Sequence, residues 1–158
     1  MFSRTRLLPM STLPMRYIPV LGICMLLLFS CPARAWNGKV LKVLSGDTIV
    51  VSWKDQSRTV KLYGIDCPET QTGPGQKARA FTRAKAKAKT AKINPMTRDE
   101  QGRTVAQVFM NGQSLNAFIV RSGYGLVNRK QCTVPSCEDW LRYERYAYKR
   151  HKGIWAKL

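Results

Sequence analysis

The sequence predicts an α+β domain with a mainly antiparallel sheet. Segments rich in Val, Ile, Leu and Thr, separated by turn-forming residues, come first in the chain. A segment rich in Ala and Lys follows, then another strand-like segment, and then two segments that begin with Ser and carry apolar residues at helical spacing. Strands and helices grouped in this way favour an α+β architecture, and five such strands are enough to close a small barrel.

Four strand segments are expected, at residues 40–53, 59–65, around 93, and 104–110. Ser45-Gly46-Asp47 interrupts the first segment, which therefore forms two strand pieces around a bulge or tight turn. Residues 54–57 and Asn111-Gly112 have turn composition. Pro68 and Pro95 are expected to end strands, because proline has no N–H to donate to a neighbouring strand.

Three helices are expected. The first spans residues 76–89 and follows a break at Gly73-Pro74-Gly75. The other two each begin with a serine, whose hydroxyl can accept a hydrogen bond from the first turn, and each end at a glycine. These residues are Ser114 with Gly123, and Ser136 with Gly153. The core-facing residues of the first helix are expected to be Ala78, Phe81 and Ala88.

Residues 1–35 have the pattern of a cleaved secretory signal peptide. An arginine-containing segment precedes an apolar run over residues 17–30, and Ala33-Arg34-Ala35 is a small-x-small cleavage pattern. The apolar run is short for a membrane span, although an uncleaved anchor and a lipidated Cys31 stay open. Residues 36–158 would then form the folded domain, which we expect in the periplasm or outside the cell, as a monomer with no stable membrane association.

The folded domain is strongly basic. The chain has 27 Lys and Arg residues against 9 Asp and Glu residues. Four of the arginines lie in the predicted signal peptide, so residues 36–158 keep 23 basic residues and a net charge of +14. Such an excess attracts polyanions, with nucleic acid as the first candidate and an anionic membrane surface as the second. Arg83, Lys85 and Lys87 lack acidic partners at helical spacing and are candidates for contacts with a nucleic-acid backbone.

The cysteines favour a disulfide over a metal site. Cys132 and Cys137 are close enough in sequence to pair in an oxidising compartment. Zinc is the competing interpretation, but the third cysteine of the domain, Cys67, is distant and the one histidine is His151. His151 lies in a run of basic residues, so a Ser-His-Asp triad is not indicated either.

The placement of the acidic residues is informative. Asp47 follows a glycine at the break in the first strand pair, and Asp66 and Glu69 flank Pro68 after the next strand. If the two strands pair, the three carboxylates can converge at one end of the sheet, where they suit a hard divalent cation. Asp47 and Asp66 could equally be turn residues that satisfy backbone donors.

Arg103 follows a glycine just before a predicted strand. Its planar guanidinium could bind a phosphate through two nitrogens. The spacing alone favours a plain salt bridge to Asp99 or Glu100.

Three motifs resemble those of the thermonuclease (staphylococcal or micrococcal nuclease) family. They are Val43-Leu44-Ser45-Gly46-Asp47-Thr48-Ile49-Val50, Val60-Lys61-Leu62-Tyr63-Gly64-Ile65-Asp66-Cys67-Pro68-Glu69-Thr70 and Gly102-Arg103-Thr104-Val105-Ala106. Their order and spacing fit the family, and Lys152-Gly153-Ile154-Trp155 resembles its usual ending. The similarity covers essentially all of residues 36–158.

The resemblance implies a five-stranded OB-type β-barrel with about three helices, a fold that commonly holds oligonucleotides. It implies hydrolysis of phosphodiester bonds in DNA and RNA with one bound calcium ion. The implied ligands of this ion are Asp47, Asp66 and the backbone carbonyl of Cys67. Glu69 would position or deprotonate the attacking water, and Lys61 and Arg103 would contact the phosphate.

Three places depart from the family pattern. The family has an arginine at Lys61, so a planar fork becomes a point charge. It has an aromatic residue where Gln101 stands, and tyrosines near Asn128 and Arg129. These changes bear on rate and base preference more than on reaction type. A second hypothesis is a non-catalytic nucleic-acid-binding barrel. A third, a membrane-disrupting protein, lacks the amphipathic helix it would need.

Overall fold

The computed structural model describes residues 34–156. Its first strand begins at Trp36, the predicted first residue of the mature chain. The predicted signal peptide, residues 1–35, lies almost wholly outside the described residues, so its cleavage stays a prediction. Within the described part of the chain, no helix is both long enough and apolar enough to cross a membrane.

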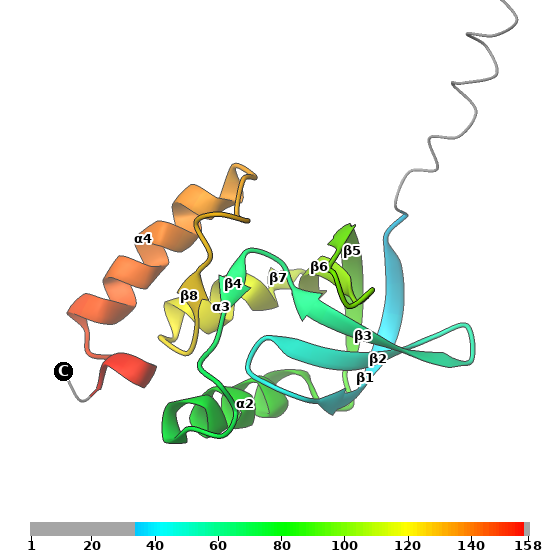
Figure 1. Cartoon of the computed structure of the whole chain (residues 1–158), viewed down its shortest axis with the longest axis horizontal. Helices are drawn as coiled ribbons and strands as arrows, with labels where there is room; N and C mark the ends of the chain where they lie inside the picture. Colours follow the sequence, from blue (N-terminus) through cyan, green and yellow to red (C-terminus); the bar gives the residue numbers. More distant parts are fainter. Residues whose placement is uncertain (1–33, 157–158) are drawn as a thin grey trace, which may run out of the picture. The chain divides into compact units, whose positions relative to one another are not determined.

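Five strands close into a barrel (Figure 1). They are β1 (Trp36–Val43), β2 (Thr48–Trp53), β3 (Gln56–Leu62), β5 (Thr90–Arg98) and β6 (Thr104–Met110). Their pairings are antiparallel, except that β3 runs parallel to β6 and so closes the barrel. The predicted five-stranded barrel of an α+β domain is confirmed.

Buried and more exposed side chains alternate along the strands, so that one face of each strand fills the core and the other forms the outer surface. Ile49 and Val51 of β2 and Val60 and Leu62 of β3 are fully buried. Because successive side chains point to opposite faces of a strand, Lys61 lies outside this core, between two buried residues. The barrel therefore presents a charged side chain on its outer face while the neighbouring positions fill its interior.

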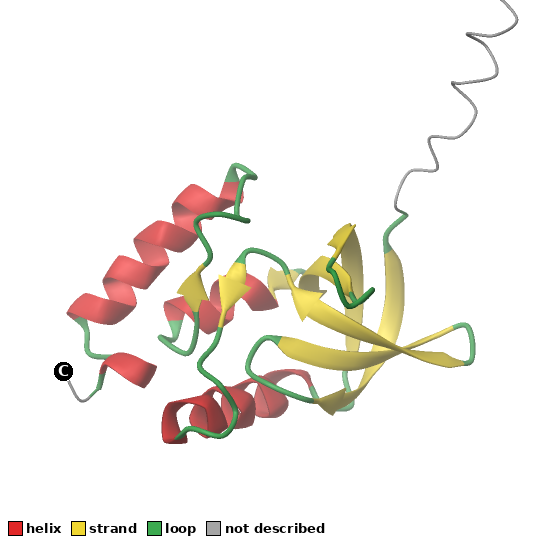
Figure 2. Ribbon diagram, viewed as in Figure 1, coloured by secondary structure: helices red, strands yellow, loops and turns green. Residues whose placement is uncertain are grey.

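Three α-helices accompany the barrel (Figure 2): α2 (Gly73–Ala86), α3 (Leu115–Arg121) and α4 (Ser136–Lys149). The short elements are β4 (Ile65–Asp66), β7 (Gln113–Ser114), β8 (Leu126–Val127) and the 3-10 helix η2 (Gly153–Trp155). α2 contacts β1, and α3 contacts both β6 and α4. β4 and β8 pair in a small second sheet, which lies next to the site described below.

The two predicted hairpin turns are present. Lys54 and Asp55 have φ values of 45° and 61°, and positive φ at both residues is what a type I′ hairpin turn requires. β3 therefore starts at Gln56, inside the predicted turn at 54–57. Asn111-Gly112 has the same character, with φ values of 49° and 79°.

α2 differs from the predicted first helix at both ends. Gly73-Pro74-Gly75, expected as a break, forms the first helical turn, and Thr72 caps it by accepting a hydrogen bond from the Gly75 N–H (3.1 Å). Proline is tolerated there because first-turn N–H groups have no helical partner. The chain reverses at Ala88, where φ is 65°, so Ala88 is exposed and Ala86 is buried instead. The other two predicted core-facing residues are Ala78, which is buried, and Phe81, which is partly buried.

Three further boundary predictions are wrong. β5 continues through Pro95, because the strand register shifts just after it and the missing N–H falls at a bulge. Ser136 is the first residue of α4 rather than its cap, a position that Pro135 occupies without a side-chain hydrogen bond. α4 ends before Gly153, which begins η2. Ser114 does cap α3 as predicted.

Cys132 and Cys137 form the predicted disulfide, with Cα atoms 5.7 Å apart. The bond ties the loop before α4 to the first turn of that helix. A disulfide-bonded pair cannot serve as zinc thiolates, so the competing interpretation is wrong. Cys67 is the free cysteine among the described residues.

Candidate active site

Three segments bring two carboxylates and one ammonium group together. Asp47 precedes β2, Lys61 lies near the end of β3, and Asp66 belongs to β4. Lys61 Nζ is 2.5 Å from Asp47 Oδ2 and 3.0 Å from Asp66 Oδ1. The register of β2 and β3, in which Thr48 is opposite Lys61, produces this approach. The two aspartates do converge, with one positive charge between them.

Asp47 is buried and fully hydrogen bonded. Its Oδ1 accepts hydrogen bonds from Ser45 Oγ (2.7 Å) and Thr48 Oγ1 (3.1 Å), and its Oδ2 accepts one from the Cys67 N–H (2.9 Å) besides that from Lys61. Burial by itself would raise the pKa of Asp47, but the Lys61 charge and the hydrogen bonds from Lys61, Ser45 and the Cys67 N–H hold this pKa below the usual value. Asp47 is therefore at once a turn residue and a member of a charged cluster.

The same balance acts on Lys61. Burial would lower the pKa of its ammonium group, but the charge of Asp47, the hydrogen bonds to both aspartates and the charge of Asp66 together raise it. Both Lys61 and Asp47 are consequently charged at neutral pH.

Asp66 is the more exposed aspartate, with 51% of its side chain accessible. Its Oδ2 accepts a hydrogen bond from Asn128 Nδ2 at 2.7 Å. The pairing of β4 with β8, in which Asp66 is opposite Leu126, brings Asn128 to this position. Sequence reasoning noted Asn128 as a departure from the family but missed its contact with Asp66, because the two residues are 62 positions apart and no local pattern links them.

Glu69 lies in the turn that leads from β4 into α2, and its side chain is exposed. The Glu69 carbonyl accepts hydrogen bonds from Thr72 Oγ1 (2.7 Å) and the Thr72 N–H (2.9 Å), which fix the turn. Gly75 permits a close approach, since a Cβ there would lie 1.9 Å from the same carbonyl oxygen. Within residues 34–156 the Glu69 carboxylate has no hydrogen-bond partner, so it is available to a water molecule.

The Cys67 thiol packs against Gly46 and Gly125. A Cβ on Gly46 would lie 2.6 Å from Cys67 Sγ and 2.9 Å from Ala78 Cβ, so Gly46 leaves the space that the sulfur and α2 occupy. Burial raises the pKa of the thiol, which keeps it protonated. Its backbone carbonyl, rather than its sulfur, is the ligand that the family resemblance implies.

A tight loop between β5 and β6 positions Arg103. Asp99 Oδ1 accepts hydrogen bonds from the N–H groups of Gln101 (3.1 Å) and Arg103 (2.9 Å), and Gly102 has a φ of 73°. Asp99 Oδ2 accepts a bond from Arg103 Nε at 2.6 Å. The salt bridge between Arg103 and Asp99 that the spacing favours is therefore present. Only Nε of Arg103 takes part in it, and the two terminal nitrogens of the guanidinium have no hydrogen-bond partner in the described part of the chain.

The predicted site residues fall into two groups. Lys61 is opposite Val105 in the parallel β3–β6 pair, so Arg103, two residues before Val105, lies on the same face of the sheet as Lys61. Asp47, Asp66 and Cys67 adjoin this face through the contacts above. Glu69 follows two residues after Cys67, and its contacts within residues 34–156 are with the first turn of α2. The exposed residues Arg83, Lys85 and Lys87 are not in this cluster. They lie at the C-terminal end of α2, roughly 20 Å along the helix from its start near Glu69.

The aspartate pair can hold one cation, because the Lys61 ammonium already lies within bonding distance of both carboxylates. Carboxylate and carbonyl oxygens suit calcium, which accepts waters as its remaining ligands. Over residues 34–156 no group of three or more His, Cys, Asp or Glu side chains is arranged around a metal position. Asp47 and Asp66 are thus a pair of oxygen donors of the kind that a hard divalent cation takes, at a position that the Lys61 ammonium occupies.

A comparison with protein families decides where this chain belongs. The family model described as "Staphylococcal nuclease homologue" matches residues 59–157. The chain belongs to the staphylococcal nuclease homologue family. The matched region of this staphylococcal nuclease homologue includes Lys61, Asp66, Glu69 and Arg103, whereas Asp47 precedes it.

Several curated relatives of this staphylococcal nuclease homologue carry nuclease names. An uncharacterized endonuclease of Escherichia coli O157:H7 is 29% identical over 144 residues, which cover 89% of this chain and 90% of the relative. A micrococcal nuclease of Shigella flexneri is 29% identical over 140 residues, or 82% and 80% of the two chains. A thermonuclease of Staphylococcus hyicus is 25% identical over 126 residues, or 75% of each chain.

Proposed function

We propose that the protein is a calcium-dependent nuclease that hydrolyses phosphodiester bonds in DNA and RNA. The observation that supports this most is the convergence of Asp47 and Asp66 on one cation position. Exposed Glu69 follows on the same loop, and Arg103 lies on the same face of the sheet as Lys61. Relatives named endonuclease, micrococcal nuclease and thermonuclease support the same reaction class.

The proposed roles follow from the chemistry of each group. Asp47, Asp66 and the Cys67 carbonyl would hold the calcium ion, which when bound supplies positive charge near the phosphate. Arg103 donates hydrogen bonds from its terminal nitrogens to the phosphate, and Lys61 adds a second positive charge, so that charge developing during attack is neutralised. Glu69 positions the attacking water and accepts its proton.

Export to the periplasm or the medium and a monomeric state are part of this proposal. They rest on the signal-peptide pattern of residues 1–35 and on the basic character of residues 36–158. A protein N-terminus at Trp36, read by mass spectrometry of the exported material, would support cleavage. A lipidated Cys31 or a retained Met1 would contradict it.

A non-catalytic nucleic-acid-binding barrel is the second candidate. Lys61 favours it, because its ammonium group occupies the position that calcium would need. The exposed Glu69 carboxylate and the terminal nitrogens of Arg103 favour catalysis, since neither has a hydrogen-bond partner among residues 34–156.

Cleavage assays with calcium and with chelator separate the candidates. The purified protein is expected to cut labelled DNA and RNA in calcium, to stop in excess EGTA, and to work poorly with zinc, which prefers nitrogen and sulfur ligands. Undiminished cleavage in EGTA would contradict the calcium mechanism. Oligonucleotide binding without cleavage under any of these conditions would establish the binding barrel instead.

A further inference from the structure

Asn128 connects the candidate active site to a turn that the proposed mechanism does not use. Its side-chain Nδ2 donates a hydrogen bond to Asp66 Oδ2 at 2.7 Å. Its Oδ1 accepts hydrogen bonds from the N–H groups of Lys130 and Gln131, each at 3.1 Å. Because two backbone donors hold the oxygen, the amide nitrogen is the end that faces the aspartate. The turn over residues 128–132 therefore fixes both the place and the orientation of the group that contacts Asp66.

The backbone of the same turn is bound to the segment that leads to Asp66. The Asn128 N–H donates to the Gly64 carbonyl at 2.9 Å, and the Cys132 N–H donates to the Asn128 carbonyl at 2.8 Å. A Cβ on Gly64 would lie 2.7 Å from Cys132 Sγ, so the sulfur packs directly on the residue that receives the Asn128 N–H. One cysteine of the disulfide therefore belongs to the turn and contacts the segment before Asp66.

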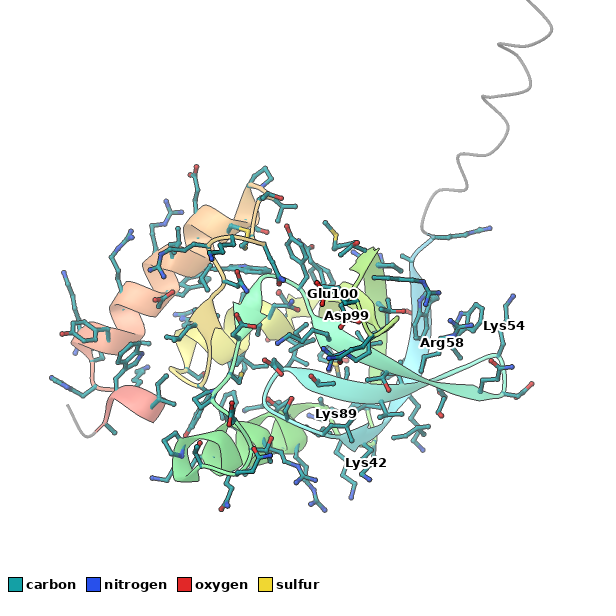
Figure 3. All side chains as sticks on the ribbon, viewed as in Figure 1. Lys42, Lys54, Arg58, Lys89, Asp99 and Glu100 are labelled. Carbon is teal, nitrogen blue, oxygen red and sulfur yellow. A yellow bond between two sulfur atoms is a disulfide. The ribbon has the colours of Figure 1, made fainter. Side chains whose placement is uncertain are left out.

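The disulfide is the covalent bond between this turn and the hydrophobic core. Its other cysteine, Cys137, lies in the first turn of α4 and is buried, with 5% of its surface exposed. Figure 3 draws the bond in yellow beside the start of α4. Most side chains of the turn and its continuation are exposed, namely Arg129, Lys130, Gln131 and Thr133. A segment with so few buried side chains opens locally at low cost unless a covalent bond restrains it.

Hydrogen bonds would hold part of this loop after loss of the disulfide. The Thr133 N–H donates to the Tyr63 hydroxyl at 3.0 Å, and the two hydroxyl groups of these residues are 3.1 Å apart. The five barrel strands do not include the loop. Breaking the disulfide is therefore expected to loosen the turn around Asn128 without unfolding the barrel.

Asp66 needs the support of Asn128 most when a cation is bound. The Asp66 side chain is exposed, and its other hydrogen-bond partner within residues 34–156 is Lys61 Nζ at 3.0 Å. A cation that binds both aspartates displaces this ammonium group. Asn128 Nδ2 is then the protein donor that still holds the Asp66 carboxylate. Removing a group that hydrogen bonds to a metal-ligating carboxylate commonly lowers metal affinity about 10- to 100-fold.

We propose that Asn128 is a positioning residue for Asp66, and that the Cys132–Cys137 disulfide, by fixing the turn, makes calcium binding depend on oxidation. The proposal rests on the proposed nuclease function for the use of calcium. Reduction by a dithiol breaks the sulfur–sulfur bond with two electrons and two protons, and it yields two thiols and the oxidised dithiol. The reduced protein binds calcium more weakly, so cleavage is favoured in an oxidising compartment, where disulfides persist.

Isothermal titration of calcium into the purified protein, without nucleic acid, tests both parts. Asn128→Ser keeps an oxygen for the N–H groups of the turn but is too short to reach Asp66. We expect this variant to bind calcium about tenfold more weakly than the wild type, and Cys132→Ser with Cys137→Ser to show a similar loss. The control is Gln131→Ala, which removes an exposed neutral side chain from the same turn and should bind calcium like the wild type.

Combining the changes separates an effect through Asn128 from a general loss of stability. If the disulfide acts through Asn128, removing it from Asn128→Ser should cost less than about a further twofold, whereas independent effects multiply. Dithiothreitol should shift the wild type to the affinity of the cysteine variant and leave the cysteine variant unchanged. Melting temperatures show which variants are folded, and reduction of the wild type below its melting temperature replaces the cysteine variant if that variant does not fold.

Cleavage assays connect these affinities to activity. The calcium concentration that gives the half-maximal rate should rise about tenfold in Asn128→Ser, with the rate at saturating calcium nearly unchanged. Unchanged calcium affinity in Asn128→Ser, an equal loss in Gln131→Ala, or losses that multiply in the combined variant would overturn the proposal. A wild type that binds no calcium would overturn it together with the calcium mechanism. If the affinities change as expected but the wild type never cleaves, the nuclease proposal fails while the role of Asn128 stands.

Discussion

At the scale of single residues, Lys61 sets the electrostatics of the site. Its ammonium group is compact enough to bridge Asp47 and Asp66, and so it neutralises two carboxylates that would otherwise repel each other. Asp47 has its full set of protein donors only while Lys61 stays in place. A calcium ion bound to both aspartates must therefore displace this ammonium, which then becomes available to a phosphate.

Replacing Lys61 tests this competition. In chelator, Lys61→Gln should lower the free energy of unfolding by about 1–3 kcal/mol, because Asp47 stays buried without its charged partner. The variant should bind calcium about tenfold more tightly, which is ~1.4 kcal/mol, because no ammonium has to be displaced. Its kcat should fall, because a cation at the phosphate is lost.

Isothermal titration gives the calcium affinity independently of activity, and denaturant melts in EGTA give the stability. Lys61→Arg, which keeps a cation at this position, is the control, and its kcat should equal or exceed that of the wild type. Equal calcium affinity in the wild type and Lys61→Gln would show that Lys61 does not occupy the cation position in solution.

Individual residues differ in how far the sequence predicts them. Asp47, Asp66 and Glu69 stand out because acids are scarce in a basic chain and these three follow strand ends. Asn128 does not stand out, because its contact with Asp66 depends on the pairing of β8 with β4, which brings together residues far apart in sequence.

At the scale of secondary-structure elements, the first turn of α2 holds Glu69. Thr72 caps the helix and also donates to the Glu69 carbonyl, and Gly75 packs against that same carbonyl. The helix start and the position of the proposed general base are therefore one structural unit. A side chain at Gly75 should move both.

Two glycines in this turn form a matched pair of tests. Gly75→Ala should destabilise the protein by about 1–3 kcal/mol, because the new methyl group overlaps the Glu69 carbonyl. It should also lower kcat. Gly73→Ala should change stability by less than about 1 kcal/mol, because no atom lies within 4 Å and the gain in helix propensity offsets the cost of a side chain before proline. Thermal melts measure the change in stability, and steady-state kinetics measure the change in kcat. Equal stability and equal kcat in the two variants would show that the start of α2 does not affect catalysis.

The strands were predictable where local pattern decides them, as in β6 and its Asn111-Gly112 turn. Element ends were less predictable, because they depend on partners. Thr72 makes a helical turn out of Gly73-Pro74-Gly75, and the bulge after Pro95 lets β5 continue. Ser136 has no capping role because α4 begins one residue earlier than expected, with Pro135 at the cap position.

At the scale of the whole molecule, the positive charge of residues 36–158 attracts the substrate without orienting it. Arg83, Lys85 and Lys87, near the basic end of α2, are exposed and have no hydrogen bond or ion pair with the aspartates in the described part of the chain, so any effect of these residues on cleavage should come through substrate binding. The closing β3–β6 pair, which joins residues more than 40 positions apart, has no local signal in the sequence. The number of strands allowed a closed barrel, and the family resemblance predicted it.

Neutralising the end of α2 tests the long-range contribution of charge. Changing Arg83, Lys85 and Lys87 to Gln should raise KM for a long oligonucleotide and reduce the slope of its salt dependence, while kcat stays nearly constant. The matched control neutralises three exposed cations elsewhere, Lys130, Arg145 and Lys149. Measuring KM as a function of salt distinguishes the α2 variant from the control variant. An unchanged slope in the α2 variant would mean that Arg83, Lys85 and Lys87 are solvated surface charges that do not contact the substrate.

The most direct measurement of the central claim is the rate at which Glu69→Gln cleaves one labelled oligonucleotide at saturating calcium, relative to the wild type. Glu69 is exposed and its carboxylate has no partner among residues 34–156, so the melting temperature should stay unchanged. The account predicts that the wild type cleaves and that kcat of the variant falls about 100-fold or more, the usual contribution of a general base. Equal cleavage by the variant and the wild type, or no cleavage by either, would contradict it.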